Sequence, residues 1–312
     1  MLLVEKCLWH GVLPLLFAEA ELPPIVKSAR ETARGWQWAL AARTRSLNDV
    51  IVGLCDTLAG EPFMLIKGGD YGRRLYPEMS LRPMQDIDIL VPSARIDEVG
   101  RRVQRAGYTL MPSAGAVRDP AHHERGFFKG DILVEVHQAF TQRPRHRIDY
   151  DAIWQRRVPL EIQGRQAARL DDVDALAYQG VSMATDQLFV RFIRFVDLWL
   201  LLHQRDGIAL AAAERARDWQ ATHALYATFS QACRLFPGFR TPEVTEAMAR
   251  VLSVRARRFI DRWVLPEPAE VRSTRRPRRW LQLWRKVCLM DTSVRRGAFA
   301  LSHAMATIRA WL

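Results

Sequence analysis

The chain has 312 residues, enough for one large domain or two modest ones, and its 49% hydrophobic and 26% charged residues are typical of a soluble globular protein. The formal net charge of +12 favours an anionic partner, such as a nucleotide, a nucleic acid, an acidic protein or a membrane surface, although an arginine-rich proteome would give the same excess. Because the four cysteines lie far apart and form no C-x-x-C pair, we expect neither a zinc site nor a disulfide framework, and a reducing cytoplasm fits.

The N-terminal sequence is apolar but does not have the pattern of a targeting segment. Glu5, Lys6 and His10 interrupt it, and no basic stretch precedes a clean apolar run, so we expect no signal peptide. No run of about 18 apolar residues occurs in the chain, so we expect no membrane span.

The first 60 residues are expected to be helical. Residues 4–18 predict a short helix, Pro23 and Pro24 break the chain, and apolar residues at helical spacing predict a long helix over residues 26–58. We therefore assign residues 1–60 to a helical segment that packs on the core.

A strand and a glycine turn follow. Residues 63–67 predict a strand that ends at Gly68 and Gly69. Asp70 is expected to cap a short helix that ends near Leu75. Glycines at a strand-to-helix turn let backbone N–H groups approach phosphates closely.

A second strand over residues 86–91 carries two carboxylates. Side chains alternate between the faces of a strand, so Asp86, Asp88 and Leu90 share one face. The residues of the opposite face are apolar: Ile87, Ile89 and Val91. The apolar face can anchor in a core while the two like charges project together, which is unfavourable unless a cation lies near them.

The chain then predicts a helix over residues 94–106, a short strand over residues 108–111 and a polar loop over residues 112–123. A hairpin follows, turning at residues 129–131. Its second strand places Ile132, Val134 and Val136 on one face, and Leu133, Glu135 and His137 on the other. One face is again apolar and the other carries an acid. A second hairpin is expected over residues 157–170. We therefore assign residues 61–168 to the catalytic core.

Residues 169–312 are expected to form a helical domain with a basic C-terminal tail. Capping acids at Asp171 and Asp172 precede the first of its helices. The expected helices cover residues 173–185, 188–204, 209–217, 221–236, 242–263 and 296–312. In the tail, from residue 271 onward, tryptophans and leucines stand next to arginines. This pattern is compatible with a membrane-surface or RNA-binding role, or with a helix whose tryptophans pack on the domain while its arginines face solvent.

The order of these elements predicts metal-assisted chemistry at phosphorus. Two or three carboxylates on neighbouring strands can hold Mg²⁺, which prefers oxygen ligands and often binds substrate phosphates as well. A pair of such ions stabilises the attacking and leaving oxygens of an in-line displacement, and a third carboxylate can accept the proton of the attacking hydroxyl. Each motif is weak alone, and their order and spacing make the combination specific.

The combination resembles the DNA polymerase β-like nucleotidyltransferase superfamily, and within it an uncharacterised nucleotidyltransferase family. The matching segments are I-K-G-G at residues 66–69, L-Y-P at 75–77, L-R-P-M-Q-D-I-D-I-L-V at 81–91, E-V-H at 135–137 and R-F-V-D-L at 194–198. The resemblance covers roughly residues 5–205. The sequence departs from the family pattern at Asp70, where small residues are common, and at Gln138, where an aromatic residue often stands.

The resemblance implies an α+β fold, in which a small mixed sheet with helices is flanked by N-terminal helices and a C-terminal helical domain. It implies that Asp86, Asp88 and Glu135 form the catalytic metal site for two Mg²⁺ ions. It also implies that Gly68, Gly69, Lys67 and Arg82 bind the nucleotide, and that His137 and Asp197 lie on the acceptor side.

Several of these roles have alternatives in the sequence. Lys67 is equally able to form an ion pair with Asp86 or Glu135. Arg82 is equally able to stabilise the loop in which it lies. His137 is also explained as a buried hydrogen-bonded histidine, and Asp197 as the partner of Arg194 one turn away.

The implied activity is transfer of a nucleoside monophosphate from an NTP to a hydroxyl-type acceptor, with release of pyrophosphate. The acceptor expected is a small molecule, a pathway peptide, a protein or an RNA end. Alternatives are a non-catalytic nucleotide-binding or toxin–antitoxin-type interaction protein that retains the fold, and a basic membrane-surface protein that acts through residues 271–312.

Overall fold

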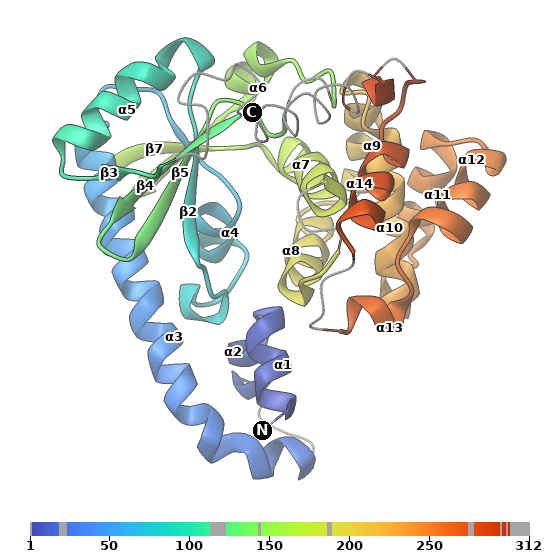
Figure 1. The fold of residues 1–312 in the computed structure, drawn as a ribbon, viewed down its shortest axis with the longest axis horizontal. Coiled ribbons are helices and arrows are strands. Elements are labelled where there is room, and N and C mark those ends of the chain that lie inside the picture. Colours follow the sequence, from blue (N-terminus) through green and yellow to red (C-terminus); the bar gives the residue numbers. More distant parts are fainter. Residues whose placement is uncertain are drawn as a thin grey trace.

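The computed structural model describes residues 2–18, 24–112, 123–142, 145–185, 189–273, 278–293, 295–297 and 299 (Figure 1). A mixed seven-stranded sheet lies beside a bundle of helices formed by the second half of the chain. No helix in these described ranges is both long enough and apolar enough to cross a membrane.

The sheet has the strand order β3-β4-β5-β2-β1-β7-β6. Its strands are β1 (Met64–Leu65), β2 (Asp86–Leu90), β3 (Thr109–Leu110), β4 (Glu124–Lys129), β5 (Ile132–His137), β6 (Val158–Ile162) and β7 (Arg165–Arg169). The pairs β2–β5 and β1–β7 are parallel, and the other neighbours are antiparallel. The α+β class expected from the sequence is confirmed.

The α-helices are α1 (Leu2–His10), α2 (Leu13–Ala18), α3 (Pro24–Thr57), α4 (Gly68–Arg74), α5 (Ile96–Arg105), α6 (Tyr150–Arg156), α7 (Asp172–Thr185), α8 (Phe192–Leu202), α9 (Ile208–Asp218), α10 (Thr222–Leu235), α11 (Pro242–Val251), α12 (Val254–Phe259), α13 (Pro268–Val271) and α14 (Arg279–Cys288). Short turns of other helix types are η1 (Met79–Leu81), η2 (Ser93–Arg95), η3 (Pro237–Phe239) and η4 (Ile260–Val264).

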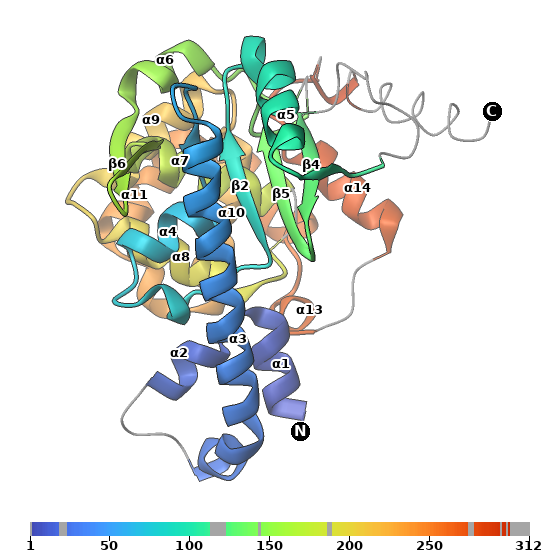
Figure 2. The same ribbon diagram turned by 90° about the vertical axis from the view of Figure 1, so that its left-hand side faces the viewer.

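The two faces of the sheet pack against different helices, as the alternation in β2 and β5 predicts. Ile87, Ile89, Val134 and Val136 are fully buried in a cluster with residues of α3 and α5, and these two helices lie in front of the sheet in Figure 2. On the opposite face, Leu90 joins the core of the helical bundle. The acidic face of β2 and β5 carries Leu90 and is therefore the face turned toward the bundle. Figure 1 shows the bundle beside the sheet.

The hairpin expected over residues 157–170 is confirmed as β6–β7, and it extends the sheet, a position that was not predicted from the sequence. Its two-residue turn, Gln163 and Gly164, has positive φ at both positions, 50° and 77°, and turns of this kind match the twist of paired strands. β7 then pairs in parallel with β1, with Met64 opposite Ala168. The chain leaves the sheet at Arg169 and enters α7, so this hairpin directly connects the sheet to the bundle.

Three expected elements differ from the structure. The helix over residues 4–18 is divided at Gly11, whose φ is 70°. The helix over residues 242–263 is divided into α11, α12 and η4, because Ser253 caps a new helix by accepting a hydrogen bond from the N–H of Ala256. The loop over residues 112–123 and the helix over residues 296–312 lie largely outside the described residues.

Helix α14 packs differently from the expected arrangement in which the tail buries its tryptophans. Trp280 and Trp284 are 64% and 38% exposed, whereas Arg285 is buried and donates two hydrogen bonds to Glu270, at 2.5 and 2.9 Å. The expectation that the arginines face solvent is therefore wrong at Arg285, because a carboxylate on α13 lies within reach of its guanidinium.

Candidate active site

Three carboxylates converge on the bundle-facing side of β2 and β5. These strands are parallel, and their register places Asp88 directly opposite Glu135. Asp86 precedes Asp88 by two residues and therefore lies on the same face. Carboxylate oxygens of Asp88 and Glu135 and a ring nitrogen of His137 lie within 4.8 Å of one another, which is close enough to share one ion.

Asp88 is buried and its charge is balanced by two cationic groups. Lys67 Nζ lies 2.6 Å from Asp88 Oδ1, and His137 Nε2 lies 2.8 Å from the same oxygen. Burial by itself would raise the pKa of Asp88, but Lys67 and His137 outweigh burial and hold that pKa well below its ordinary value. Asp88 is therefore ionised at neutral pH. Lys67 thus pairs with Asp88, a carboxylate that was not considered as its partner from the sequence.

Asp86 is in the opposite situation. Burial, followed by repulsion from Asp88 and Glu135, raises the pKa of Asp86 to about 6. The positive charge near Asp86 is therefore too small to neutralise the carboxylates around it. An oxygen-rich donor set with unbalanced negative charge suits Mg²⁺, so Asp86, Asp88 and Glu135 fit that ion.

His137 lies between the carboxylates and is 1% exposed. Its Nε2 is 3.5 Å from Glu135 Oε2 in addition to its contact with Asp88. Burial and Lys67 oppose protonation, but the hydrogen bonds to Asp88 and Glu135 raise the pKa of His137 to about 9. His137 therefore contacts two of the three carboxylates, Asp88 and Glu135.

The turn between β1 and α4 is strained at Lys67. This residue has φ 49° and ψ −126°, a conformation that glycine adopts far more readily than lysine. The ammonium that lysine supplies contacts Asp88, so the strained backbone carries a side chain of the site. Because Lys67 turns the chain so sharply, α4 begins at Gly68, and the expected helix cap at Asp70 is wrong. Asp70 lies inside the helix and is bonded to Arg74.

Gly68 and Gly69 have different surroundings. A Cβ on Gly68 would lie 2.4 Å from Arg82 Nη1 and 2.9 Å from Met84 Cγ, whereas a Cβ on Gly69 would meet nothing closer than Leu65 Cδ2 at 3.4 Å. Gly68 is therefore required by the packing beneath the turn, and Gly69 is not.

We expect Gly68→Ala to lower the free energy of unfolding by about 1–3 kcal/mol, because Arg82 or Met84 must move to relieve the overlap. Gly69→Ala is the matched control and should unfold at nearly the wild-type urea concentration. Urea unfolding followed by circular dichroism checks both variants. Equal losses of stability in the two would contradict the packing argument.

Arg82 is held in a buried ion pair with Asp197 of α8. Its Nε and Nη2 donate to the two carboxylate oxygens of Asp197 at 3.0 and 2.7 Å, and the hydroxyl of Tyr76 donates to the same carboxylate at 2.7 Å. Arg194, considered from the sequence as the partner of Asp197, instead donates to the hydroxyl of Ser182. The pair thus joins the loop before β2 to the helical bundle, directly beneath Gly68.

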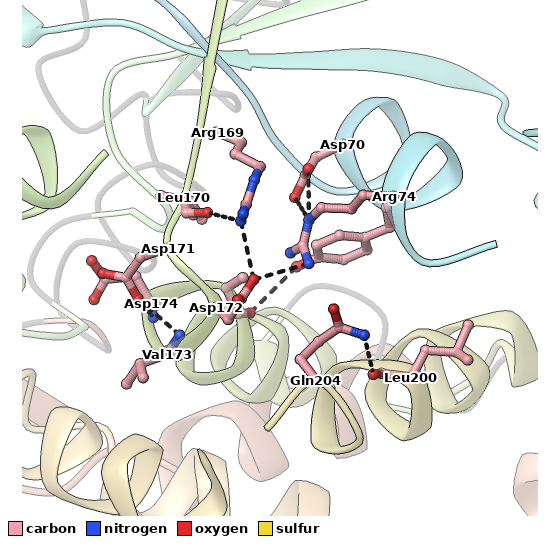
Figure 3. Close-up of polar contacts among 12 residues, drawn as sticks. Asp70, Arg74, Arg169, Leu170, Asp171, Asp172, Val173, Asp174, Leu200 and Gln204 are labelled. Atoms are coloured by element: carbon pink, nitrogen blue, oxygen red, sulfur yellow. Dashed lines mark hydrogen bonds and ion pairs between the residues drawn. The ribbon is translucent and has the colours of Figure 1, made fainter. Parts of the chain in front are cut away.

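A second set of ion pairs joins α4 to the start of α7 (Figure 3). Arg74 binds Asp70 at 2.9 Å and Asp172 at 3.0 Å, and Arg169 at the end of β7 also binds Asp172 at 3.0 Å. Asp171 caps α7 as expected, accepting hydrogen bonds from the backbone N–H groups of Val173 and Asp174. Figure 3 shows these side chains converging from α4, β7 and α7, so the glycine turn is fixed to the bundle from two sides.

His123 and Glu124 also lie next to the site, and sequence reasoning missed Glu124. In the β4–β5 pair Glu124 is opposite His137, and Glu124 Oε2 is 3.2 Å from His137 Nδ1 and 3.1 Å from His123 Nε2. The sequence signal was present in the H-E pair that opens the hairpin, but the register of β4 against β5 was needed to place it.

Comparisons with known proteins identify a family for this chain. The profile of a family described as uncharacterised nucleotidyltransferase matches residues 2–237. No curated protein matches the chain.

Two solved structures are similar over part of the chain. The solution structure of the antibiotic-resistance factor ANT(2'')-Ia is 13% identical, with a TM-score of 0.38, over 55% of this chain and 94% of that chain. The crystal structure of an antigenic nucleotidyltransferase-like protein from Paracoccidioides brasiliensis is 14% identical, with a TM-score of 0.32, over 63% of this chain and 90% of that chain.

Proposed function

This chain belongs to the uncharacterised nucleotidyltransferase family, and we propose that it transfers a nucleoside monophosphate from an NTP to a hydroxyl-type acceptor, with release of pyrophosphate. The observation that supports this proposal is the parallel register of β2 and β5, which places Asp88 opposite Glu135 with Asp86 on the same face. Carboxylates of this number on adjacent strands, beside a glycine turn, suit reaction at a phosphate.

We propose that Asp86, Asp88 and Glu135 hold Mg²⁺, with two ions in the complete complex. When bound, Mg²⁺ offsets the negative charge of the phosphates and of the displaced oxygen. Asp88 is already ionised in the metal-free protein, and a divalent cation near Asp86 would lower its raised pKa and keep it ionised as well.

The β1–α4 turn is the proposed site of the triphosphate. Backbone N–H groups of Gly68 and Gly69 lie at the beginning of α4, where N–H groups have no partner within the helix. Lys67 neutralises Asp88 in the metal-free protein, and we propose that its ammonium moves to the phosphates when cations occupy the carboxylates. Arg82 supports this site from beneath, because its guanidinium is fixed by Asp197 and packs on Gly68.

The proposed reaction breaks one bond and forms one bond at the α-phosphorus. The acceptor oxygen attacks the α-phosphorus, the bond to the bridging oxygen breaks, and pyrophosphate leaves with that oxygen. Glu135 is the proposed base for the acceptor proton, because its side chain is 23% exposed while that of Asp88 is 4% exposed. The proposed acceptor is a small molecule, a pathway peptide, a protein or an RNA end. We propose that the reaction takes place in the cytoplasm, where the four cysteines would stay reduced.

Label position tests this proposal. The protein is incubated with cell extract, Mg²⁺ and one NTP at a time, labelled with ³²P at either the α- or the γ-phosphate. We expect the α-label to appear on an acceptor and the γ-label to appear in pyrophosphate, and EDTA should prevent both.

Two outcomes would replace the proposal. Transfer of the γ-label to an acceptor would indicate a kinase. NTP binding without transfer of either label, in extract of the source organism, would favour the non-catalytic nucleotide-binding alternative.

A further inference from the structure

A cluster of two histidines and one glutamate lies beside the carboxylate site, at the edge where β4 meets β5. His123 immediately precedes β4, Glu124 begins it, and His137 ends β5. Because Glu124 and His137 are partners in the antiparallel register, all three residues lie at the same level of the sheet. The proposed nucleotidyl transfer uses neither His123 nor Glu124.

The spacing of the three donor atoms is that of metal ligands. Glu124 Oε2 is 3.2 Å from His137 Nδ1 and 3.1 Å from His123 Nε2, and one ligand atom of each of the three residues lies within 4.8 Å of the other two. Two ligands bound tetrahedrally to Zn²⁺ at its usual bond lengths are about 3.3 Å apart. The cluster therefore surrounds a point that an ion of this size can occupy with little movement.

The two ring nitrogens of His137 have different partners. Nε2 lies 2.8 Å from Asp88 Oδ1, whereas Nδ1 is buried and makes no hydrogen bond with any described residue, although Glu124 lies near it. A metal-bound histidine usually donates its second N–H to a carboxylate, which fixes the ring and directs the other nitrogen to the ion. Asp88 is such a carboxylate, and the free Nδ1 points toward Glu124.

We propose that His123 Nε2, Glu124 Oε2 and His137 Nδ1 bind one zinc-class transition-metal ion, with a water molecule as the fourth ligand. Two imidazoles and a carboxylate suit Zn²⁺, whereas Mg²⁺ prefers oxygen ligands alone. The expectation that the chain has no zinc site rested on its cysteines, and this site uses none. Zn²⁺ bound here would replace a proton on His137 and hold the ring against Asp88, so the two metal sites would share one connecting side chain.

Zinc binding in the presence of excess Mg²⁺ tests the proposal without any measurement of transfer. The purified protein is dialysed against limiting Zn²⁺, and bound metal is measured by mass spectrometry. We expect one Zn²⁺ per wild-type chain, and an affinity more than about tenfold weaker in His123→Ala and in Glu124→Gln. The same site loaded with Co²⁺ should show the visible absorption of a tetrahedral complex.

Matched variants separate this site from the carboxylates. His203→Ala removes a histidine that follows α8 and lies outside the cluster, and Asp86→Asn alters the proposed Mg²⁺ site alone, so both should keep wild-type zinc affinity. Unfolding midpoints in EDTA show that each variant is folded. The proposal is overturned if the wild-type chain binds no stoichiometric Zn²⁺. That result is expected if His137 keeps both of its protons, because Nδ1 then has no lone pair for the ion. It is also overturned if Asp86→Asn abolishes zinc binding while His123→Ala does not. Neither of these two results would bear on nucleotidyl transfer, because zinc binding is measured without it.

Discussion

Replacing Asp86 or Asp88 by asparagine is expected to lower the rate of nucleotidyl transfer by about a thousandfold. Asparagine keeps the shape of the side chain but removes the negative charge that would hold a cation, and metal stabilisation of phosphate charge is worth several kcal/mol. At about 1.4 kcal/mol for each factor of ten, a loss of this size gives the stated decrease. The rate of α-label transfer at saturating Mg²⁺ checks it, and Glu98→Gln on α5, whose side chain is 27% exposed, is the control.

The same two substitutions should change stability in opposite directions in the metal-free protein. The pKa of Asp86 is raised from 3.8 to about 6, so ionised Asp86 opposes folding at neutral pH, and Asp86→Asn should raise the free energy of unfolding by up to about 3 kcal/mol. Because the folded pKa lies above the unfolded one, this gain should be fully present above pH 6 and shrink as the pH falls toward 4. Asp88→Asn should instead destabilise, since Lys67 and His137 would lose their shared partner.

Urea unfolding in EDTA at several pH values measures both effects. The result that contradicts the electrostatic description is a change in the same direction for both variants, or a gain in Asp86→Asn that does not depend on pH. Loss of activity combined with increased stability in Asp86→Asn would show that the carboxylate is retained for function and not for the fold.

Asp197→Ala is expected to lower the free energy of unfolding by about 3–5 kcal/mol, because it leaves the buried guanidinium of Arg82 without its anion. The double variant Arg82→Met, Asp197→Leu removes both charges and should recover much of this loss. Transfer activity should fall in both variants, because Arg82 no longer supports the turn at Gly68.

The exposed pair Arg101–Glu98 provides the control for this prediction. Its arginine side chain is 57% exposed, so Glu98→Ala should leave the unfolding curve nearly unchanged. If Asp197→Ala behaves like Glu98→Ala, the buried pair does not hold the loop to the bundle. If the double variant is as unstable as Asp197→Ala, the loss comes from packing and not from the unpaired charge.

Local patterns in the sequence predicted which face of each strand carries the carboxylates and most of the elements around them. The alternation of apolar and acidic residues in β2 and β5 predicts which face of each strand is buried, because side chains of a strand point in turn to opposite faces. Ile87 and Val134 are accordingly buried on one face, and Asp88 and Glu135 lie together on the other. The glycine turn was equally visible, since Gly68 and Gly69 follow directly on an apolar strand.

The partners of the charged side chains depended on the tertiary structure. Asp70, expected as a helix cap, binds Arg74, since the strained backbone of Lys67 starts α4 at Gly68. Asp197 binds Arg82, 115 residues away, and not Arg194 on its own helix. Pairing across such distances in the chain has no local sequence signal, because loops of any length can bring the two groups together at similar cost.

The sequence by itself therefore determined the strand faces, the glycine turn and the identity of the three carboxylates, all of which follow from the local periodicity of strands and the conformational freedom of glycine. The tertiary structure alone decided how the sheet is ordered and which groups neutralise one another. The parallel register of β2 and β5 brings Asp88 to Glu135, and the antiparallel register of β4 and β5 brings Glu124 to His137. Register is a property of two strands at once, so it follows from the packing of the whole sheet.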